Sequence, residues 1–186
     1  MRKLIMQMNV SLDGCADHTV AIADDELHEF AAGQLDAIDT LLFGRVTYQL
    51  MESYWPQARR DPEATASMIA FADRFNALPK IVFSRTLRKV EGENARIISD
   101  NVEEEVLKLK RQSGKNLGIG GISLCQEFMR RGLIDEYVLL VQPVVWGKGR
   151  RLFEDRNVRI GLELMDTKTF KSGVVVLRYR PASSSS

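Results

Sequence analysis

One segment of the sequence, residues 41–48, has the residue types and spacing of a phosphate-binding turn. An apolar run stops at Gly44, and Arg45 and Thr47 follow where a helix is expected to begin. Backbone N–H groups at a helix start lack partners within the helix, so beside a hydroxyl and a guanidinium they suit an anionic phosphate. A plain turn after a strand explains the same glycine, so this segment alone does not establish a binding site.

A second segment, residues 117–123, repeats this arrangement. Gly120 and Gly121 end an apolar run and let a ligand approach the backbone closely, and a helix is expected from about Ser123. The run does not match the GxGxxG dinucleotide fingerprint, because Ser123 stands in the place of the last glycine. Two such turns on one sheet nevertheless fit the two ends of a pyrophosphate, so together they predict a dinucleotide site.

A third candidate is the strand end at residues 81–86. Ser84, Arg85 and Thr86 follow an apolar run there. A guanidinium fork with two hydroxyls could hold the 2′-phosphate of a dinucleotide. The alternative is an ordinary solvated strand end.

Acidic residues near the N-terminus are the candidates for proton transfer. They are Asp13, Asp24, Asp25 and Glu26. Glu26 begins a helix whose apolar face would line a pocket, where a carboxyl group can acquire a raised pKa and act as a general acid. The alternative is that the cluster caps this helix and interacts with its dipole.

The spacing of apolar residues predicts one α/β domain over residues 1–180. The strands expected are 4–10, 40–43, 80–84, 117–119, 136–142, 162–170 and 174–180. The helices expected are 24–36, one from Arg45, one from Asp61-Pro62, one from Asp100 or Asn101, and 123–131. Strand and helix alternate as far as residue 142, which predicts a largely parallel sheet covered on both faces. The last two strands flank 171–173 and predict a closing antiparallel hairpin.

Composition and charge restrict the class of protein. The chain has 26 basic and 25 acidic side chains and a net charge of +1, which offers no extended field for nucleic acid or an anionic membrane. Cys15 and Cys125 form no CxxC pattern, so no metal site is predicted and a reducing, cytoplasmic compartment is favoured. No apolar run approaches the ~20 residues of a membrane span. The serine-rich end, residues 181–186, is predicted to be a disordered tail.

In order and spacing, the motifs resemble those of the dihydrofolate-reductase-like superfamily. The closer similarity is to the branch with the riboflavin-biosynthesis reductase (RibD C-terminal) domain and its small stand-alone bacterial relatives. The resemblance covers about residues 2–180. The motifs that carry it are Ser11-Leu12-Asp13-Gly14, Glu26-Leu27-His28-Glu29-Phe30, Gly44-Arg45-Val46-Thr47-Tyr48, Phe83-Ser84-Arg85-Thr86-Leu87, Gly120-Gly121, residues 132–137 and residues 143–149.

That resemblance implies a central eight-stranded sheet and NADPH-dependent hydride transfer to a C=N or C=O bond of a small, pterin- or pyrimidine-like heterocycle. It implies a homodimer through the last strands. The implied cofactor contacts are Val10, Ser11 and Leu12 near the nicotinamide, Gly44, Arg45 and Thr47 at the pyrophosphate, Ser84 and Arg85 at the 2′-phosphate, and Gly120, Gly121, Ile122 and Ser123 at the second phosphate junction. The implied catalytic residues are Glu26, which matches the acid that assists protonation, and Asp13 beside it at the substrate.

The sequence departs from true dihydrofolate reductases at two places. Residues 14–24 lack the tryptophan of the flexible loop in those enzymes, and Leu78-Pro79-Lys80 continues into the next strand without the arginine that clamps folate. A lysine cannot form the same bidentate fork with a carboxylate. Folate is therefore not the expected substrate. Dihydrofolate reductase proper and a non-catalytic NADPH-binding protein remain the alternatives.

Overall fold

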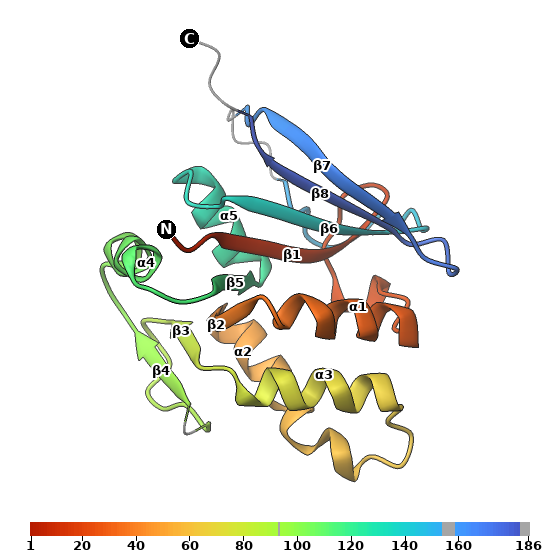
Figure 1. Cartoon of the computed structure of the whole chain (residues 1–186), viewed down its shortest axis with the longest axis horizontal. Coiled ribbons are helices and arrows are strands. Elements are labelled where there is room, and N and C mark those ends of the chain that lie inside the picture. The colour runs from red at the N-terminus through yellow and green to blue at the C-terminus, as the bar shows by residue number, and fades with distance from the viewer. Residues whose placement is uncertain (93, 154–158, 183–186) are drawn as a thin grey trace.

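The computed structural model describes residues 1–92, 94–153 and 159–182, and its centre is an eight-stranded sheet with the order β4-β3-β2-β5-β1-β6-β8-β7. The strands are β1 (Leu4–Ser11), β2 (Ile38–Gly44), β3 (Lys80–Phe83), β4 (Ala95–Ile98), β5 (Asn116–Gly120), β6 (Glu136–Gln142), β7 (Leu162–Thr169) and β8 (Val175–Pro181). Strands β1 to β6 are parallel to one another, whereas β8 is antiparallel to β6 and to β7. The predicted mostly parallel sheet with a closing antiparallel hairpin is confirmed (Figure 1).

Helices cover both faces of this sheet (Figure 1). They are α1 (Asp25–Leu35), α2 (Arg45–Glu52), α3 (Ala66–Ala77), α4 (Val102–Arg111) and α5 (Ile122–Arg130), with short 3₁₀ helices η1 (His18–Val20) and η2 (Trp55–Arg60). The apolar sides of α1, α2 and α3 pack with β2 and β3 in one core cluster, and α1 also packs on β6 and β8. Those of α4 and α5 pack on the opposite face of β1, β2, β3 and β5. The helices therefore form two layers, one on each face of the sheet.

Two elements differ from their sequence-based predictions. The helix expected from Asp61-Pro62 begins only at Ala66, where Thr65 accepts a hydrogen bond from the Met68 N–H as its N-cap. The Asp61 carboxylate instead accepts bonds from the Tyr54 hydroxyl and the Glu63 N–H in a turn. Strand β4 was not predicted, because it is a short edge strand with no buried residue and no alternation of apolar and polar residues.

The end of the chain is ordered further than predicted. Strand β8 extends through Pro181, and the Ala182 N–H donates to Gly161 O at 2.8 Å. The predicted boundary at residue 180 therefore does not hold for these two residues. Residues 183–186 of the predicted serine-rich tail lie outside the described residues.

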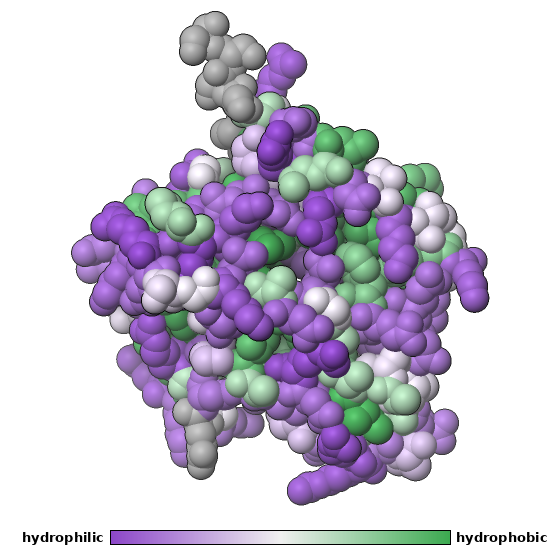
Figure 2. Space-filling model, viewed as in Figure 1, coloured by the Kyte–Doolittle hydropathy of each residue, from purple (hydrophilic) through white to green (hydrophobic). Residues whose placement is uncertain are grey.

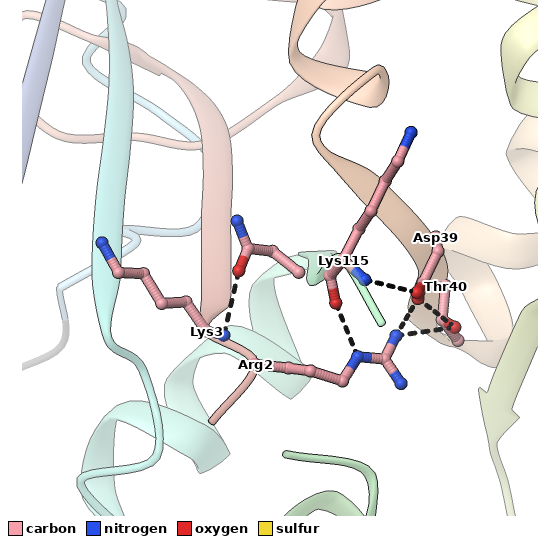
Figure 3. Close-up of polar contacts among 6 residues, drawn as sticks. Arg2, Lys3, Asp39, Thr40 and Lys115 are labelled. Carbon is pink, nitrogen blue, oxygen red and sulfur yellow. Dashed lines mark hydrogen bonds and ion pairs between the residues drawn. The ribbon is translucent and has the colours of Figure 1, made fainter. Parts of the chain in front are cut away.

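A cluster of polar residues around the buried Arg2 ties three strands together at the end where they begin (Figure 3). Arg2, whose side chain is 5% exposed, pairs with the Asp39 carboxylate and donates from Nε to Lys115 O at 2.6 Å. The Lys115 N–H in turn donates to Asp39 Oδ2 at 2.7 Å. The cluster joins the segments that open β1, β2 and β5, and it lies at the opposite edge from the predicted cofactor site.

The face of the domain drawn in Figure 2 is mostly hydrophilic. On the face drawn in Figure 2, apolar side chains form small separate patches among polar ones. Among the residues that the structure describes, no helix is both long and apolar enough to cross a membrane.

Candidate active site

The predicted site residues lie at one edge of the sheet, where the parallel strands end. The register places Phe43 beside Gly120, Gly44 beside Phe83, and Ser11 beside Gln142. Carboxyl ends of parallel strands form the crevice in which open α/β sheets bind ligands. The junctions that the sequence singles out therefore belong to one region.

The starts of α2 and α5 touch each other within this region. Gly44 is the N-cap of α2 and Gly121 that of α5, and neither helix start is capped by a side chain. Gly121 has a φ of +98°, and a Cβ built there would overlap Thr47 Oγ1 and lie 3.2 Å from Thr47 Cβ. The two predicted phosphate turns thus form one cradle with unpaired N–H groups, and glycine is required where they meet.

Two predicted contact residues already have partners within the chain. Ser123 Oγ accepts a hydrogen bond of 2.9 Å from Arg150, and Ser84 Oγ accepts the Leu87 N–H at 2.9 Å. Arg45 is exposed on α2, where it donates to Gln49 at 3.3 Å, and Ile122 is half-buried as the first residue of α5. The Ser84 hydroxyl holds a local turn and that of Ser123 is bound by Arg150, so of these four residues only Arg45 presents a charge to solvent.

A cavity of about 980 Å³ lies next to the cradle, at the ends of β3 and β4 and between α4 and α5. Its lining includes Phe83, Ser84, Arg85, Asn101 and Leu124. Acidic and basic side chains both line it, and the Arg131 guanidinium forms ion pairs with Glu127 and Glu103. Arg85 is exposed and forms no ion pair with any residue that the structure describes. A guanidinium without an acid partner beside an open cavity can bind an anion.

Asp13 holds two loops together. Its carboxylate accepts the Ser11 hydroxyl at 2.6 Å and the Trp146 and Gly147 N–H groups, each at 2.9 Å. These hydrogen bonds, that from Ser11 most of all, hold the pKa of Asp13 well below its usual range. An ionised carboxylate with this set of donors serves as a loop anchor and is poorly suited to donate a proton.

We therefore expect Asp13→Asn to lower the melting temperature at neutral pH, because the amide nitrogen cannot accept the second loop N–H. A lowered native pKa stabilises the fold at pH values above the unfolded pKa, about 3.9, and this contribution is lost as pH falls through the native pKa. The difference in melting temperature between wild type and variant should hold from pH 7 to about 4 and shrink below. Melting curves in this range test it; a difference that grows on acidification would contradict an ionised anchor.

Glu26 lies in the first turn of α1 and reaches the closing hairpin. Its Oε2 accepts the Lys171 N–H at 2.8 Å from the turn between β7 and β8. The residue is half-buried, and within the described chain its Oε1 takes part in no hydrogen bond. One carboxylate oxygen is therefore anchored and the other is available to a substrate.

The residues predicted near the nicotinamide differ in accessibility. Val10 is packed in the core and Ser11 is 1% exposed, with its hydroxyl engaged by Asp13, so they can offer only backbone atoms. Leu12 is exposed and its N–H donates to Val144 O at 2.8 Å. Exposed apolar side chains line the segments after β1, β2 and β6, namely Leu12, Ile22, Val46, Leu50, Val145 and Phe153.

Sequence reasoning missed two polar residues at this edge, Asn9 and Gln142. They are hydrogen-bonded to each other at 3.0 Å and stand near the ends of otherwise apolar strands. The sequence signal that could have revealed them is a side-chain amide within a largely apolar strand, because a buried amide needs hydrogen-bond partners.

Lys80 takes no part in this site. It is 2% exposed, lies 3.7 Å from Glu52 and donates to Leu78 O at 3.2 Å. Burial lowers its pKa, and the neighbouring Glu52 opposes that effect. The lysine that stands where folate enzymes keep a clamping arginine is thus enclosed in the core.

Relatives of this chain extend over its whole length. It is 37% identical over 186 residues to the uncharacterised protein YyaP of Bacillus subtilis, with 96% of this chain and 94% of that protein covered. A second Bacillus subtilis protein, YwjB, is 28% identical and also uncharacterised.

Solved structures of similar fold include both reductase groups named above. A Shewanella protein provisionally assigned to riboflavin biosynthesis superposes with a TM-score of 0.73 at 18% identity, covering 97% of this chain and 99% of that one. The Thermotoga maritima diaminohydroxyphosphoribosylaminopyrimidine deaminase/5-amino-6-(5-phosphoribosylamino)uracil reductase gives 0.66 at 18% identity, with 97% of this chain and 57% of that chain covered. Enterococcus faecalis dihydrofolate reductase, complexed with NADP(H), gives 0.62 at 14% identity and 97% coverage of both. Together with the family model of the RibD C-terminal domain, which matches residues 2–176, these similarities place the chain: it belongs to the RibD C-terminal domain family and has a dihydrofolate-reductase-like fold.

Proposed function

We propose that this protein is an NADPH-dependent reductase that transfers a hydride to a C=N or C=O bond of a small heterocyclic substrate of pterin or pyrimidine type. The observation that carries the proposal is the cradle in which Gly121 meets Thr47 with no room for a Cβ. Two uncapped helix starts there suit a pyrophosphate, and Arg85 stands unpaired beside the adjoining cavity. Family membership and the fold agree with this assignment.

The residues of this chain would bind and orient the reactants. The N–H groups at the starts of α2 and α5 and the Arg45 guanidinium would hold the pyrophosphate, and Arg85 the 2′-phosphate. NADPH supplies the hydride when bound. Asp13 keeps the two covering loops joined, and Glu26, fixed through Oε2 to Lys171, would place Oε1 against the substrate and pass it a proton. Apolar side chains around the edge would exclude water.

The two alternatives are distinguishable. A dihydrofolate reductase would need a cation for the glutamate tail, and Lys80 is enclosed and already bound to the chain; rapid turnover of dihydrofolate would overturn our reading. A non-catalytic NADPH-binding protein would oxidise NADPH with none of the pterins or pyrimidines offered, and Glu26→Ala would change nothing.

The decisive test is a parallel titration with NADPH and NADH, followed by protein fluorescence and melting temperature. The wild type should prefer NADPH, and Arg85→Ala should weaken NADPH by ~1–3 kcal/mol, roughly 5- to 150-fold, with little effect on NADH. Arg88→Ala, which removes an equal charge outside the cavity lining, is the control. Equal losses for both cofactors would count against the assignment of Arg85, and no binding of either would overturn the proposed reductase.

The homodimer stays a prediction. The edge strand β7 offers a surface for it, since it exposes Leu164 and Met165 and, among the described residues, pairs only with β8.

A further inference from the structure

Gln142 connects three segments at the site edge through one buried carboxamide. The side chain is 0% exposed. Its Oε1 accepts the Ile22 N–H at 2.9 Å, and its Nε2 donates to Asn9 Oδ1 at 3.0 Å. Strand β1, strand β6 and the loop that leads to α1 therefore meet at this group, and Ile22 lies four residues before Glu26.

The orientation of both amides follows from the backbone. The Ile22 N–H can only donate, so the Gln142 atom that faces it must be the oxygen. Gln142 then turns its NH₂ group toward Asn9, and the Asn9 atom that meets it must be Oδ1. Hence the Asn9 NH₂ group points away from Gln142. The Ile22 N–H sets the orientation of the Gln142 amide, and the Gln142 amide sets that of Asn9.

The Asn9 NH₂ group is open to a ligand. Asn9 is half-buried, and within the described chain its Nδ2 donates to no other atom. Its Nδ2 is also not enclosed by the protein, unlike the buried polar atoms that lack a hydrogen-bond partner, such as Trp146 Nε1. Gln142 follows Val138 and Leu140 on the face of β6 that packs on α1, so the pair lies on the side of the sheet where Glu26 begins that helix.

We propose that Asn9 is a specificity-determining residue that donates a hydrogen bond to an exocyclic carbonyl oxygen of the substrate, and that Gln142 is the positioning residue that fixes this polarity. The inference rests on the proposed reductase function and narrows its substrate class to oxo-heterocycles. An amino group at the same ring position would meet two donor hydrogens, which leaves both donors unpaired.

The test compares two probes of the same shape, 2-amino-4-oxopteridine and 2,4-diaminopteridine, by fluorescence titration with and without NADPH. The quantity of interest is the ratio of their dissociation constants, and a variant with the same added charge must control for the attraction of a carboxylate to the more basic diamino ring. Asn9→Asp keeps the acceptor for Gln142 but presents an oxygen to the ligand, so the ratio should shift about tenfold or more toward the diamino probe. Gln142→Leu, which frees Asn9 to rotate, should shift it less and in the same direction.

Gln7→Glu is the matched control, since it places the same charge on the same face of β1, and in the described chain Gln7 forms no hydrogen bond with Asn9 or Gln142. Equal shifts in Asn9→Asp and Gln7→Glu would overturn the proposal. If the wild type binds NADPH but neither probe, the substrate inference fails and the reductase proposal stands. If the probes are discriminated as expected but NADPH does not bind, the reductase proposal fails and the assignment of Asn9 stands.

Amide hydrogen exchange tests the relay without any ligand. The Ile22 amide should exchange slowly in the wild type and in Asn9→Asp, and at least tenfold faster in Gln142→Leu. An unchanged exchange rate in Gln142→Leu would overturn the role of Gln142.

Discussion

Replacing Gly121 by alanine should strongly weaken both cofactor binding and the fold. The φ of +98° disfavours any residue with a Cβ, and the new methyl group would overlap Thr47 Oγ1. Strain and overpacking of this kind cost about 1–3 kcal/mol each. Because Thr47 in the first turn of α2 must move to relieve the overlap, we expect NADPH affinity to fall on the order of 100-fold, the size of effect that a displacement of about 1 Å can have. Urea unfolding and NADPH titration measure the two effects.

Gly33→Ala provides the control, since a methyl group there meets nothing within 4 Å on helix α1 and should leave cofactor binding unchanged. Adding Thr47→Ala to Gly121→Ala should recover part of the lost unfolding free energy, because it removes the overlapping hydroxyl. A Gly121→Ala variant that unfolds and binds NADPH like the wild type would show that the two helix starts do not form one cradle.

Asp39→Ala should cause a large loss of stability. The Arg2 guanidinium is 5% exposed and has the Asp39 carboxylate as its acidic partner (Figure 3). Breaking a buried ion pair costs about 3–5 kcal/mol, and we expect about 3 kcal/mol because the Asp39 side chain is 34% exposed. For a domain of this size, that corresponds to a melting temperature lower by roughly 6–12 °C. The urea midpoint should fall with an unchanged m value.

Asp73→Ala is the matched control for this prediction. Its carboxylate also pairs with a guanidinium, that of Arg59 at 2.6 Å, but both side chains are largely exposed. An exposed pair contributes about 0–1 kcal/mol. Equal losses in the two variants would contradict the importance of burial at Arg2.

The candidate site could be predicted only in part. Glycine junctions and the acidic helix start are local signals, and the structure brings Gly44, Thr47 and Gly121 to one cradle as their order suggested. The role of Asp13 as an anchor was not predictable, because its N–H donors are more than 130 residues away in the chain. The anchoring of Glu26 by Lys171 was hidden for the same reason.

The sequence-based prediction of the fold was wrong where a local signal was weak or where its residues form a different local structure. Asp61-Pro62 is a proper helix-start pattern, but Tyr54 and Glu63 occupy the Asp61 carboxylate in a turn, and the helix begins at Ala66 with Thr65 as its N-cap. β4 has no buried residue, so it leaves no periodic pattern.

The sequence by itself determined which segments are strands and helices, their order, and hence a parallel sheet whose strand ends share one edge. Periodicity and turn residues act over a few positions, which is why they can be read along the chain. The tertiary structure alone decided which side chains meet: Arg2 with Asp39, Thr47 with Gly121, and Asn9 with Gln142. These contacts depend on strand register and on the path of the chain between distant segments, and a register shift of one residue would turn a strand side chain such as Asn9 or Gln142 to the opposite face of the sheet.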